Sequence, residues 1–108
     1  MNRGDIFTVT GKGDFSSKPR PAVIIQADLF NEYHPSLTVC PISATLTENR
    51  LYRISLFPTA TNGLKFEGEI EIDKIQAIWL PRVGKHLGAV AESDMYQVDE
   101  ALRRWLDL

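Results

Sequence analysis

Cysteine and histidine are scarce in this sequence. Its 108 residues include one cysteine, Cys40, and two histidines, His34 and His86. A single cysteine cannot form a disulfide within the chain, and these three side chains are too few for a four-ligand zinc cluster. We therefore expect neither a disulfide scaffold nor a bound metal or other cofactor.

Long apolar segments are also missing. No uninterrupted apolar run exceeds four residues, as at residues 22–25, whereas a membrane-spanning helix needs about 20. The first five residues turn polar where a secretory signal would begin its apolar core. With a single cysteine and no such signal, the expected location is the reducing cytoplasm, without a membrane partner.

No charge of one sign dominates the chain. Twelve Lys and Arg against 14 Asp and Glu give a formal net charge of −2, which excludes a chain-wide basic surface of the histone type. A local basic patch remains compatible with this total. Hydrophobic residues make up 44% of the chain, an ordinary globular composition, and the length suits one domain spanning residues 1–108.

Most of the chain consists of short β-branched or aromatic segments separated by turn residues. The pattern predicts strands at residues 6–10, 22–26, 37–42 and 51–57. From residue 67 onward apolar and acidic residues alternate, and residues 75–79 prolong this strand pattern. Pro41 is expected at a sheet edge or strand end, because proline has no N–H to donate.

The C-terminal segment is the clearest helix. Four apolar residues recur at spacings of three, four and three, which is typical of an amphipathic helix: Met95, Val98, Leu102 and Trp105. A shorter helical turn is expected at 27–32, whereas the glycine-containing stretch 81–88 is interpreted as turns. The fold class is therefore strand-rich α+β, a small barrel or sandwich with a C-terminal helix.

Arg20 stands between two prolines, immediately before a strand that is apolar on both faces. Pro19 and Pro21 stiffen the backbone on either side of it. A guanidinium presented in this way suits phosphate, because its planar fork can donate two parallel hydrogen bonds. The alternative interpretation is a solvated arginine at a sheet edge.

Charged residues are unevenly distributed along the chain. The polar loop at residues 11–17 contains Phe15, which could stack on an unpaired base or simply belong to a mobile hairpin connection. Basic residues concentrate at 12–20 and 74–90, whereas four acids share one predicted strand face: Glu67, Glu69, Glu71 and Asp73. This segregation fits either a phosphate-tracking groove or an ordinary solvated surface.

Several blocks of the sequence resemble the MazF/PemK toxins of type II toxin–antitoxin modules. These blocks are Arg3-Gly4-Asp5-Ile6, residues 18–26, Val39-Cys40-Pro41-Ile42-Ser43, Asn62-Gly63-Leu64 and Ile72-Asp73-Lys74-Ile75, followed by residues 82–85 and the terminal helix. Each block is modest alone, but their joint order and spacing are specific. The resemblance spans nearly the whole chain.

The resemblance implies a small SH3-like barrel with a C-terminal helix, the fold shared by MazF toxins and the CcdB gyrase poisons. It implies a metal-independent, sequence-specific endoribonuclease that cleaves single-stranded RNA, chiefly mRNA. The 2′-hydroxyl would attack, leaving a 2′,3′-cyclic phosphate and a 5′-hydroxyl. The implied partners are a second copy of the chain, forming a homodimer, and a cognate antitoxin that competes for the RNA groove.

The resemblance also implies which residues perform the reaction. The family's catalytic arginine falls on Arg20, its hydroxyl partner on Ser43, and the aspartate proposed in some members as acid or base on Asp73. Together with the charge pattern, it indicates that RNA is contacted by Lys12, Phe15, Ser17, Lys18, Thr45, Lys74 and Arg82.

Three positions depart from the family pattern. Many relatives carry Glu-Gln in the first loop, where residues 14–17 here are Asp-Phe-Ser-Ser. The family's Asp-Gln pair is Asp73-Lys74 in this chain. The branch that uses this aspartate also has an arginine two residues earlier, where this chain has Glu71. These departures leave the preferred RNA sequence open and weaken the case for Asp73 as a base.

Two other functions stay open at this point. A CcdB-like DNA gyrase poison would share the fold and carry a tryptophan near the C-terminus, where this chain has Trp105. A non-catalytic barrel derived from a toxin would bind RNA or a peptide without cutting it. DNA breaks distinguish the first alternative, and binding without cleavage distinguishes the second.

Overall fold

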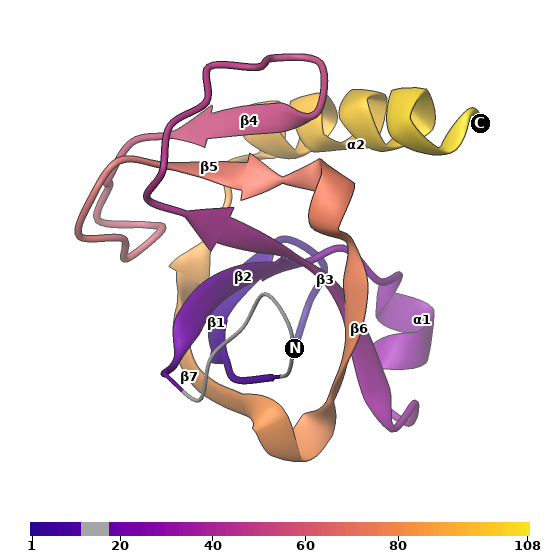
Figure 1. The fold of residues 1–108 in the computed structure, drawn as a ribbon. Coiled ribbons are helices and arrows are strands. Elements are labelled where there is room, and N and C mark those ends of the chain that lie inside the picture. The colour runs from indigo at the N-terminus through magenta and orange to yellow at the C-terminus, as the bar shows by residue number, and fades with distance from the viewer. Residues whose placement is uncertain (12–17) are drawn as a thin grey trace.

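The computed structural model describes residues 1–11 and 18–108 (Figure 1). The elements in chain order are β1 (Asp5–Val9), β2 (Arg20–Ile24), α1 (Asp28–Asn31), β3 (Ser36–Ser43), β4 (Arg53–Leu56), β5 (Gly68–Glu71), η1 (Ile72–Lys74), β6 (Gln76–Trp79), η2 (Leu80–Arg82), β7 (Val83–Ala89) and α2 (Glu92–Leu106), where η is a 3-10 helix. No helix in these ranges has the length and hydrophobicity needed to cross a bilayer.

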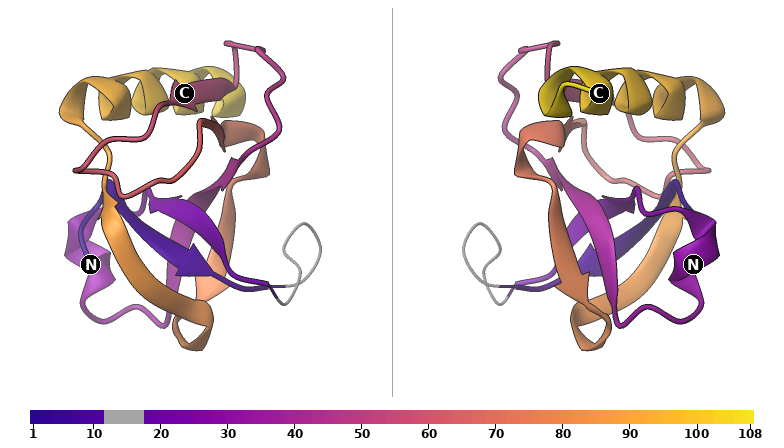
Figure 2. Two further views of the ribbon diagram at one scale, coloured as in Figure 1. Left: turned by 90° about the vertical axis from the view of Figure 1, so that its left-hand side faces the viewer. Right: turned by 90° about the vertical axis from the view of Figure 1, so that its right-hand side faces the viewer.

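The strands form one antiparallel sheet of seven strands. Its order is β4-β5-β3-β2-β1-β7, and β6 pairs with β3 beside this path. The sheet curls strongly, and α2 lies along its β4 and β5 end (Figure 1; Figure 2). Within the described residues the pairing does not close into a ring. The predicted class, strand-rich α+β with a C-terminal helix, is confirmed.

Strand β3 organises the sheet because it changes partners along its length. Residues 36–39 pair with β6, residues 42–43 pair with β5, and β2 pairs with residues 39–41 on the other side. Pro41 lies at the point where the partner changes. It was expected at an edge or strand end but is buried inside β3, where a missing N–H breaks no ladder on the side facing β6 and β5.

Two apolar clusters occupy the interior. The first includes Ile6, Val23 and Ile70 and extends to Val98 and Ala101 of α2, because these helix residues lie on one face. The second is built from alternate residues of β2, β3 and β6 together with Val9. Alternation along β4 thus leaves Arg53 on the face opposite Ile54 and Leu56. Arg20 shares a face with Ala22 and Ile24 and is exposed because it lies at the end of β2.

Two expectations for residues 72–89 were wrong. The strand pattern expected from residue 67 to 79 is broken at residues 72–74 by η1, so Asp73 lies on a turn. The stretch interpreted as turns contains β7, which pairs with β1. A Cβ at Gly84 would lie 2.5 Å from Thr8 Oγ1, so this glycine permits close approach of the two strands and does not end the structure.

Candidate active site

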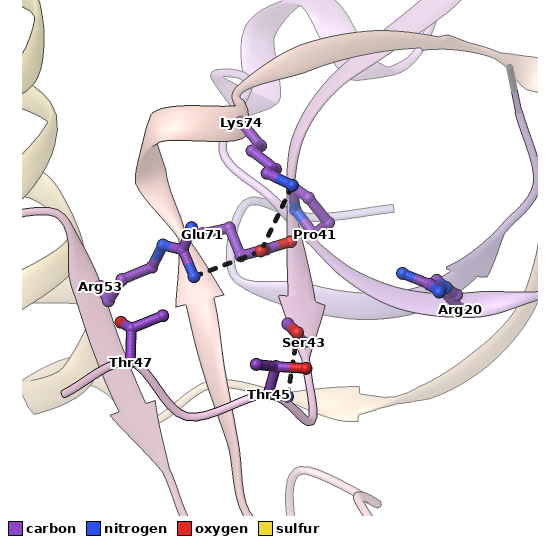
Figure 3. Close-up of a pocket in the computed structure, with 8 residues that line it drawn as sticks. All are labelled: Arg20, Pro41, Ser43, Thr45, Thr47, Arg53, Glu71 and Lys74. Atoms are coloured by element: carbon purple, nitrogen blue, oxygen red, sulfur yellow. Dashed lines mark hydrogen bonds and ion pairs between the residues drawn. The ribbon is translucent and has the colours of Figure 1, made fainter. Parts of the chain in front are cut away.

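A pocket of about 310 Å³ lies where β2, β3, β4 and β5 converge. Its lining residues are Arg20, Pro41, Ser43, Thr45, Thr47, Arg53, Glu71 and Lys74 (Figure 3). We call it the Arg20 pocket. Apart from Pro41, every lining side chain is charged or bears a hydroxyl, so the pocket suits a polar, anionic ligand better than an apolar one.

Arg20 is the first residue of β2 and is exposed. Pairing of β1 with β2 places it opposite Val9, and the flanking prolines restrict the backbone. Within residues 1–11 and 18–108 its guanidinium forms no ion pair. Figure 3 shows Arg20 on the far side of the pocket from Arg53. An exposed cation without an ion-pair partner among these residues therefore lines the pocket.

Ser43 ends β3 at the edge of the pocket. Its Oγ accepts a hydrogen bond from the backbone N–H of Thr45 at 3.0 Å, so its own O–H remains available to donate. Strand β5 approaches closely here, because a Cβ at Gly68 would lie 2.8 Å from the Ser43 carbonyl oxygen. The backbone of Ser43 is thus tightly packed, and its hydroxyl is oriented by the hydrogen bond from Thr45.

Arg53 occupies the opposite wall and is surrounded by acids. Its Nε and Nη2 donate to the two carboxylate oxygens of Asp73 at 2.7 and 3.1 Å. Nη1 lies 3.3 Å from Glu71 and 3.8 Å from Glu69. The register of β4 against β5 pairs Arg53 with Glu71, and the arginine side chain is only 10% exposed.

The acidic strand face predicted from the sequence is therefore buried at its centre and not solvated. Glu69, 2% exposed, accepts hydrogen bonds from the backbone N–H and hydroxyl of Thr47 at 3.0 and 2.9 Å. It also accepts from the backbone N–H of Glu48 at 2.9 Å. Glu48 has a φ of 60°, so the chain turns sharply around this carboxylate, which anchors the loop after Ser43.

These contacts set the ionisation of the cluster. Burial acts to raise the pKa of Asp73, but hydrogen bonds and charge from Arg53 outweigh it and hold that pKa below its ordinary value. For Glu69, burial is outweighed by the N–H groups of Thr47 and Glu48, so its pKa is also lowered. The hydrogen bond to Asp73 raises the pKa of Arg53. All three groups are charged at neutral pH.

Lys74 completes the basic side of the pocket. It follows Asp73 in η1, and its Nζ lies 3.9 Å from Oε2 of Glu71. Figure 3 shows this ion pair between the two arginines. The pocket thus contains a compensated half, built on Arg53 and the acids, and a half whose charge is available, built on Arg20.

The predicted site residues divide into four groups. Arg20, Ser43, Thr45 and Lys74 lie together in the Arg20 pocket. Asp73 is not among the lining residues, because Arg53 holds its carboxylate. Lys18 is exposed outside the lining set, and Arg82 lines a separate pocket. The remaining predictions, Lys12, Phe15 and Ser17, lie outside the described residues.

The sequence did not reveal Thr47, Arg53 or Glu71 as lining residues. Arg53 alternates with apolar residues in its strand, and this pattern placed it on the outer face. The pattern did not indicate which residues Arg53 contacts. The described residues contain no cluster of three His, Cys, Asp or Glu able to hold a metal ion. The lining side chains of the Arg20 pocket can supply hydrogen-bond donors and charge.

The fold and the pocket define a small strand-rich α+β protein with a polar pocket lined by three basic residues, Arg20, Arg53 and Lys74. The family model described as PemK-like, MazF-like toxin of type II toxin-antitoxin system matches residues 2–106. The chain belongs to this family, and the resemblance inferred from its sequence is confirmed.

Curated relatives match the full chain. A probable endoribonuclease MazF of Mycolicibacterium smegmatis is 37% identical over 108 residues, covering 100% of this chain and 98% of the relative. The endoribonuclease MazF9 of Mycobacterium tuberculosis is 29% identical over 116 residues, with 100% and 98% covered. The first relative alone is similar enough to support the same family assignment.

Solved structures share the fold. The Mycobacterium tuberculosis toxin MazF-mt6 superposes with a TM-score of 0.82 at 23% identity, covering 96% of this chain and 97% of the toxin. An endoribonuclease in complex with its cognate antitoxin from a mycobacterial species gives 0.83 at 20% identity, covering 100% and 96%. At such low identity these likenesses show the architecture.

Proposed function

We propose that this chain is a MazF-type endoribonuclease toxin that cleaves single-stranded RNA, chiefly mRNA, at the Arg20 pocket. The observation that carries the proposal is the meeting of an uncompensated arginine and an oriented serine hydroxyl in one polar pocket. Family membership and the names of the curated relatives, both endoribonucleases, support it.

The proposed reaction is transphosphorylation. The 2′-oxygen of the RNA attacks the adjacent phosphorus, the bond to the 5′-oxygen breaks, and the products are a 2′,3′-cyclic phosphate and a 5′-hydroxyl. Negative charge grows on the non-bridging oxygens, where Arg20 can donate through its fork and Ser43 through its hydroxyl. Because the RNA supplies its own nucleophile, the step needs no metal-bound water.

Asp73 has a positioning role in this proposal. Its two oxygens are engaged by Arg53 and its pKa is lowered, so it is a weak proton acceptor at neutral pH. It fixes Arg53, which in turn lies against Glu71 at the pocket wall. The acid predicted as a catalytic group therefore stabilises the wall of the site.

The proposed partners are a cognate antitoxin and a second copy of the chain. Structural neighbours include an endoribonuclease with its cognate antitoxin and a MazE-MazF assembly from Deinococcus radiodurans. An antitoxin segment with acidic residues could occupy the basic half of the Arg20 pocket. We place the toxin in the cytoplasm, where mRNA is available.

The test is incubation of the purified protein with a defined RNA pool in EDTA, followed by sequencing of new 5′-hydroxyl ends. We expect cuts enriched at one short sequence, and a cyclic phosphate on the upstream fragment. Ser43→Ala should lose most of this activity, while Ser93→Ala, an exposed serine on α2, should retain it. Uncut RNA would refute the proposal, and DNA breaks in cells without RNA cleavage would indicate a gyrase poison.

A further inference from the structure

A second pocket, of about 300 Å³, lies along strand β6. It is lined by Gly11, Gln76, Ala77, Ile78, Trp79 and Arg82. Strand β6 begins two residues after Lys74, which lines the Arg20 pocket. At 3.3 Å per residue, Trp79 lies roughly 10 Å further along the strand than Gln76. One continuous stretch of chain therefore connects the two pockets, and we call the second one the Trp79 pocket.

Trp79 is an unusually exposed aromatic residue. Its side chain is 66% exposed, although tryptophan is highly buried on average. Its neighbour Ile78 points into the core with Leu37 and Val39, so Trp79 and Ala77 share the outer face. Ala77 contributes only a methyl group there. The outer face of β6 thus presents an indole ring with a small residue beside it.

Arg82 brings positive charge to the same pocket. It is exposed and forms no ion pair in the part of the chain that the structure describes. It ends the η2 turn after Pro81, and its carbonyl oxygen accepts a hydrogen bond from the N–H of Thr10 at 3.0 Å. The backbone that presents this cation is therefore held in place.

The edge of β6 supplies polar groups. In the described sheet β6 pairs with β3 alone, and a strand edge carries N–H and C=O groups that can bind a ligand. Four consecutive residues of β6 line the pocket, so it runs along this edge. The amide nitrogen of Gln76 donates to the carbonyl oxygen of Lys74 at 3.2 Å, which holds the Gln76 side chain at the end nearer the Arg20 pocket.

We propose that the Trp79 pocket binds one nucleotide of the RNA strand beyond the bond that is cut, with its base stacked on Trp79 and a phosphate at Arg82. The proposal rests on the proposed function. An aromatic platform next to a cation holds single-stranded nucleic acid with little regard to sequence. A peptide added along β6 would use the strand edge but would need neither the indole face nor the guanidinium, so the combination favours RNA.

The first experiment compares two RNA substrates, one reaching both pockets and one filling only the Arg20 pocket. We expect Trp79→Ala to lower kcat/KM on the long RNA about tenfold, the effect of losing one base–aromatic stack, and to leave the short RNA unchanged. Trp79→Phe should keep most of the activity. Tyr96→Ala, with an aromatic side chain 63% exposed on α2, is the matched control. Equal loss on both substrates, or none on either, would overturn the proposal.

The second experiment measures binding in the Trp79 pocket in the absence of RNA cleavage. The chain has two tryptophans, so Trp105→Phe leaves Trp79 as the only indole fluorophore. Single-stranded DNA, which lacks the 2′-hydroxyl, should quench this fluorescence, and the quenching should weaken with salt and with Arg82→Gln. Quenching by a protein that cuts no RNA would refute the endoribonuclease and keep the subsite. RNA cleavage without quenching, or a Trp79→Ala variant impaired only in antitoxin binding, would refute the subsite.

Discussion

Two arginines line one pocket in opposite electrostatic surroundings. Arg53 is 10% exposed, donates two hydrogen bonds to the carboxylate of Asp73, and lies within 3.8 Å of two further carboxylates. Arg20 is exposed and has no ion-pair partner within residues 1–11 and 18–108. The charge of Arg53 is therefore compensated by neighbouring carboxylates, whereas the charge of Arg20 is available to a ligand.

The difference shows how a small near-neutral protein can bind a polyanion. Arg53 and the surrounding acids form a wall that keeps its shape without attracting phosphate. Arg20 then provides the available positive charge, and the net charge of −2 does not matter at this scale because exposed charges are screened beyond about 10 Å. Removing each arginine should accordingly have a different effect.

Replacing Arg53 should give the largest effect, on stability. Arg53→Ala leaves Asp73 and Glu69 without their ion-pair partner and leaves Glu71 with its ion pair to Lys74. Removing one partner of a buried ion pair typically costs about 3–5 kcal/mol. Urea unfolding followed by circular dichroism measures the loss. Arg53→Lys, which keeps a charge but not the bidentate geometry, should lose less. Unfolding of Arg53→Ala at the wild-type urea midpoint would show that the cluster does not stabilise the fold.

Replacing Arg20 should leave stability unchanged and remove activity. In Arg20→Ala we expect RNA cleavage to fall about a hundred- to a thousandfold, the usual result of losing one donor to a developing oxyanion. Arg20→Lys should retain part of the rate, since a point charge replaces the fork. Arg103→Ala, which removes an exposed arginine paired with Glu100 on α2, is the control and should keep wild-type cleavage. Wild-type cleavage by Arg20→Ala would contradict the assignment.

The same two arginines show what could be predicted from the sequence. Arg20 is marked by adjacent residues, Pro19 and Pro21, and by the family block around it, so it could be named as a candidate in advance. The strand predicted to begin at residue 22 begins at Arg20 itself. Ser43 is marked by its family block alone. The positions of several strands and of the terminal helix followed from apolar periodicity, which depends on residues close together in the chain. The order of the strands in the sheet could not be predicted in this way.

Arg53 could not be recognised because its partners are distant in the sequence. Asp73 is 20 residues away, and the contact with Glu71 depends on the register of β4 against β5. A shift of one residue would turn Arg53 to the opposite face, and the sequence does not fix that register. For the same reason the sequence could not show that the acids of β5 surround Arg53. Strand β7 was missed because its glycines are typical of turns, whereas here Gly84 permits close packing against Thr8 of β1 and Gly88 permits close approach of residues 61–62.

Acidic pH should weaken the interactions between Arg53 and its carboxylates, whereas Arg20 has no ion pair to lose among the described residues. Asp73 and Glu69 have folded-state pKa values below their ordinary values of 3.8 and 4.5, so their stabilisation is present above those values and is lost as pH falls through the folded-state pKa. We expect the free energy of unfolding to decline below about pH 5. In Arg53→Ala the decline should be shallower. An equal acid dependence in both proteins would contradict the role of this cluster.

The smallest effect tests whether Glu69 holds the loop that carries Thr45 and Thr47. Thr47→Val removes the hydroxyl donor to Glu69, a bond of 2.9 Å, and keeps the side-chain shape and the backbone N–H donor. A hydrogen bond to a charged group contributes about 1.5–3 kcal/mol, and we expect the lower end because two backbone donors remain. Thr45→Val is the matched control, since Thr45 lines the same pocket without contacting Glu69. If urea unfolding shows equal losses for both variants, the hydroxyl of Thr47 contributes nothing specific, and the loop is held by the two backbone N–H groups alone.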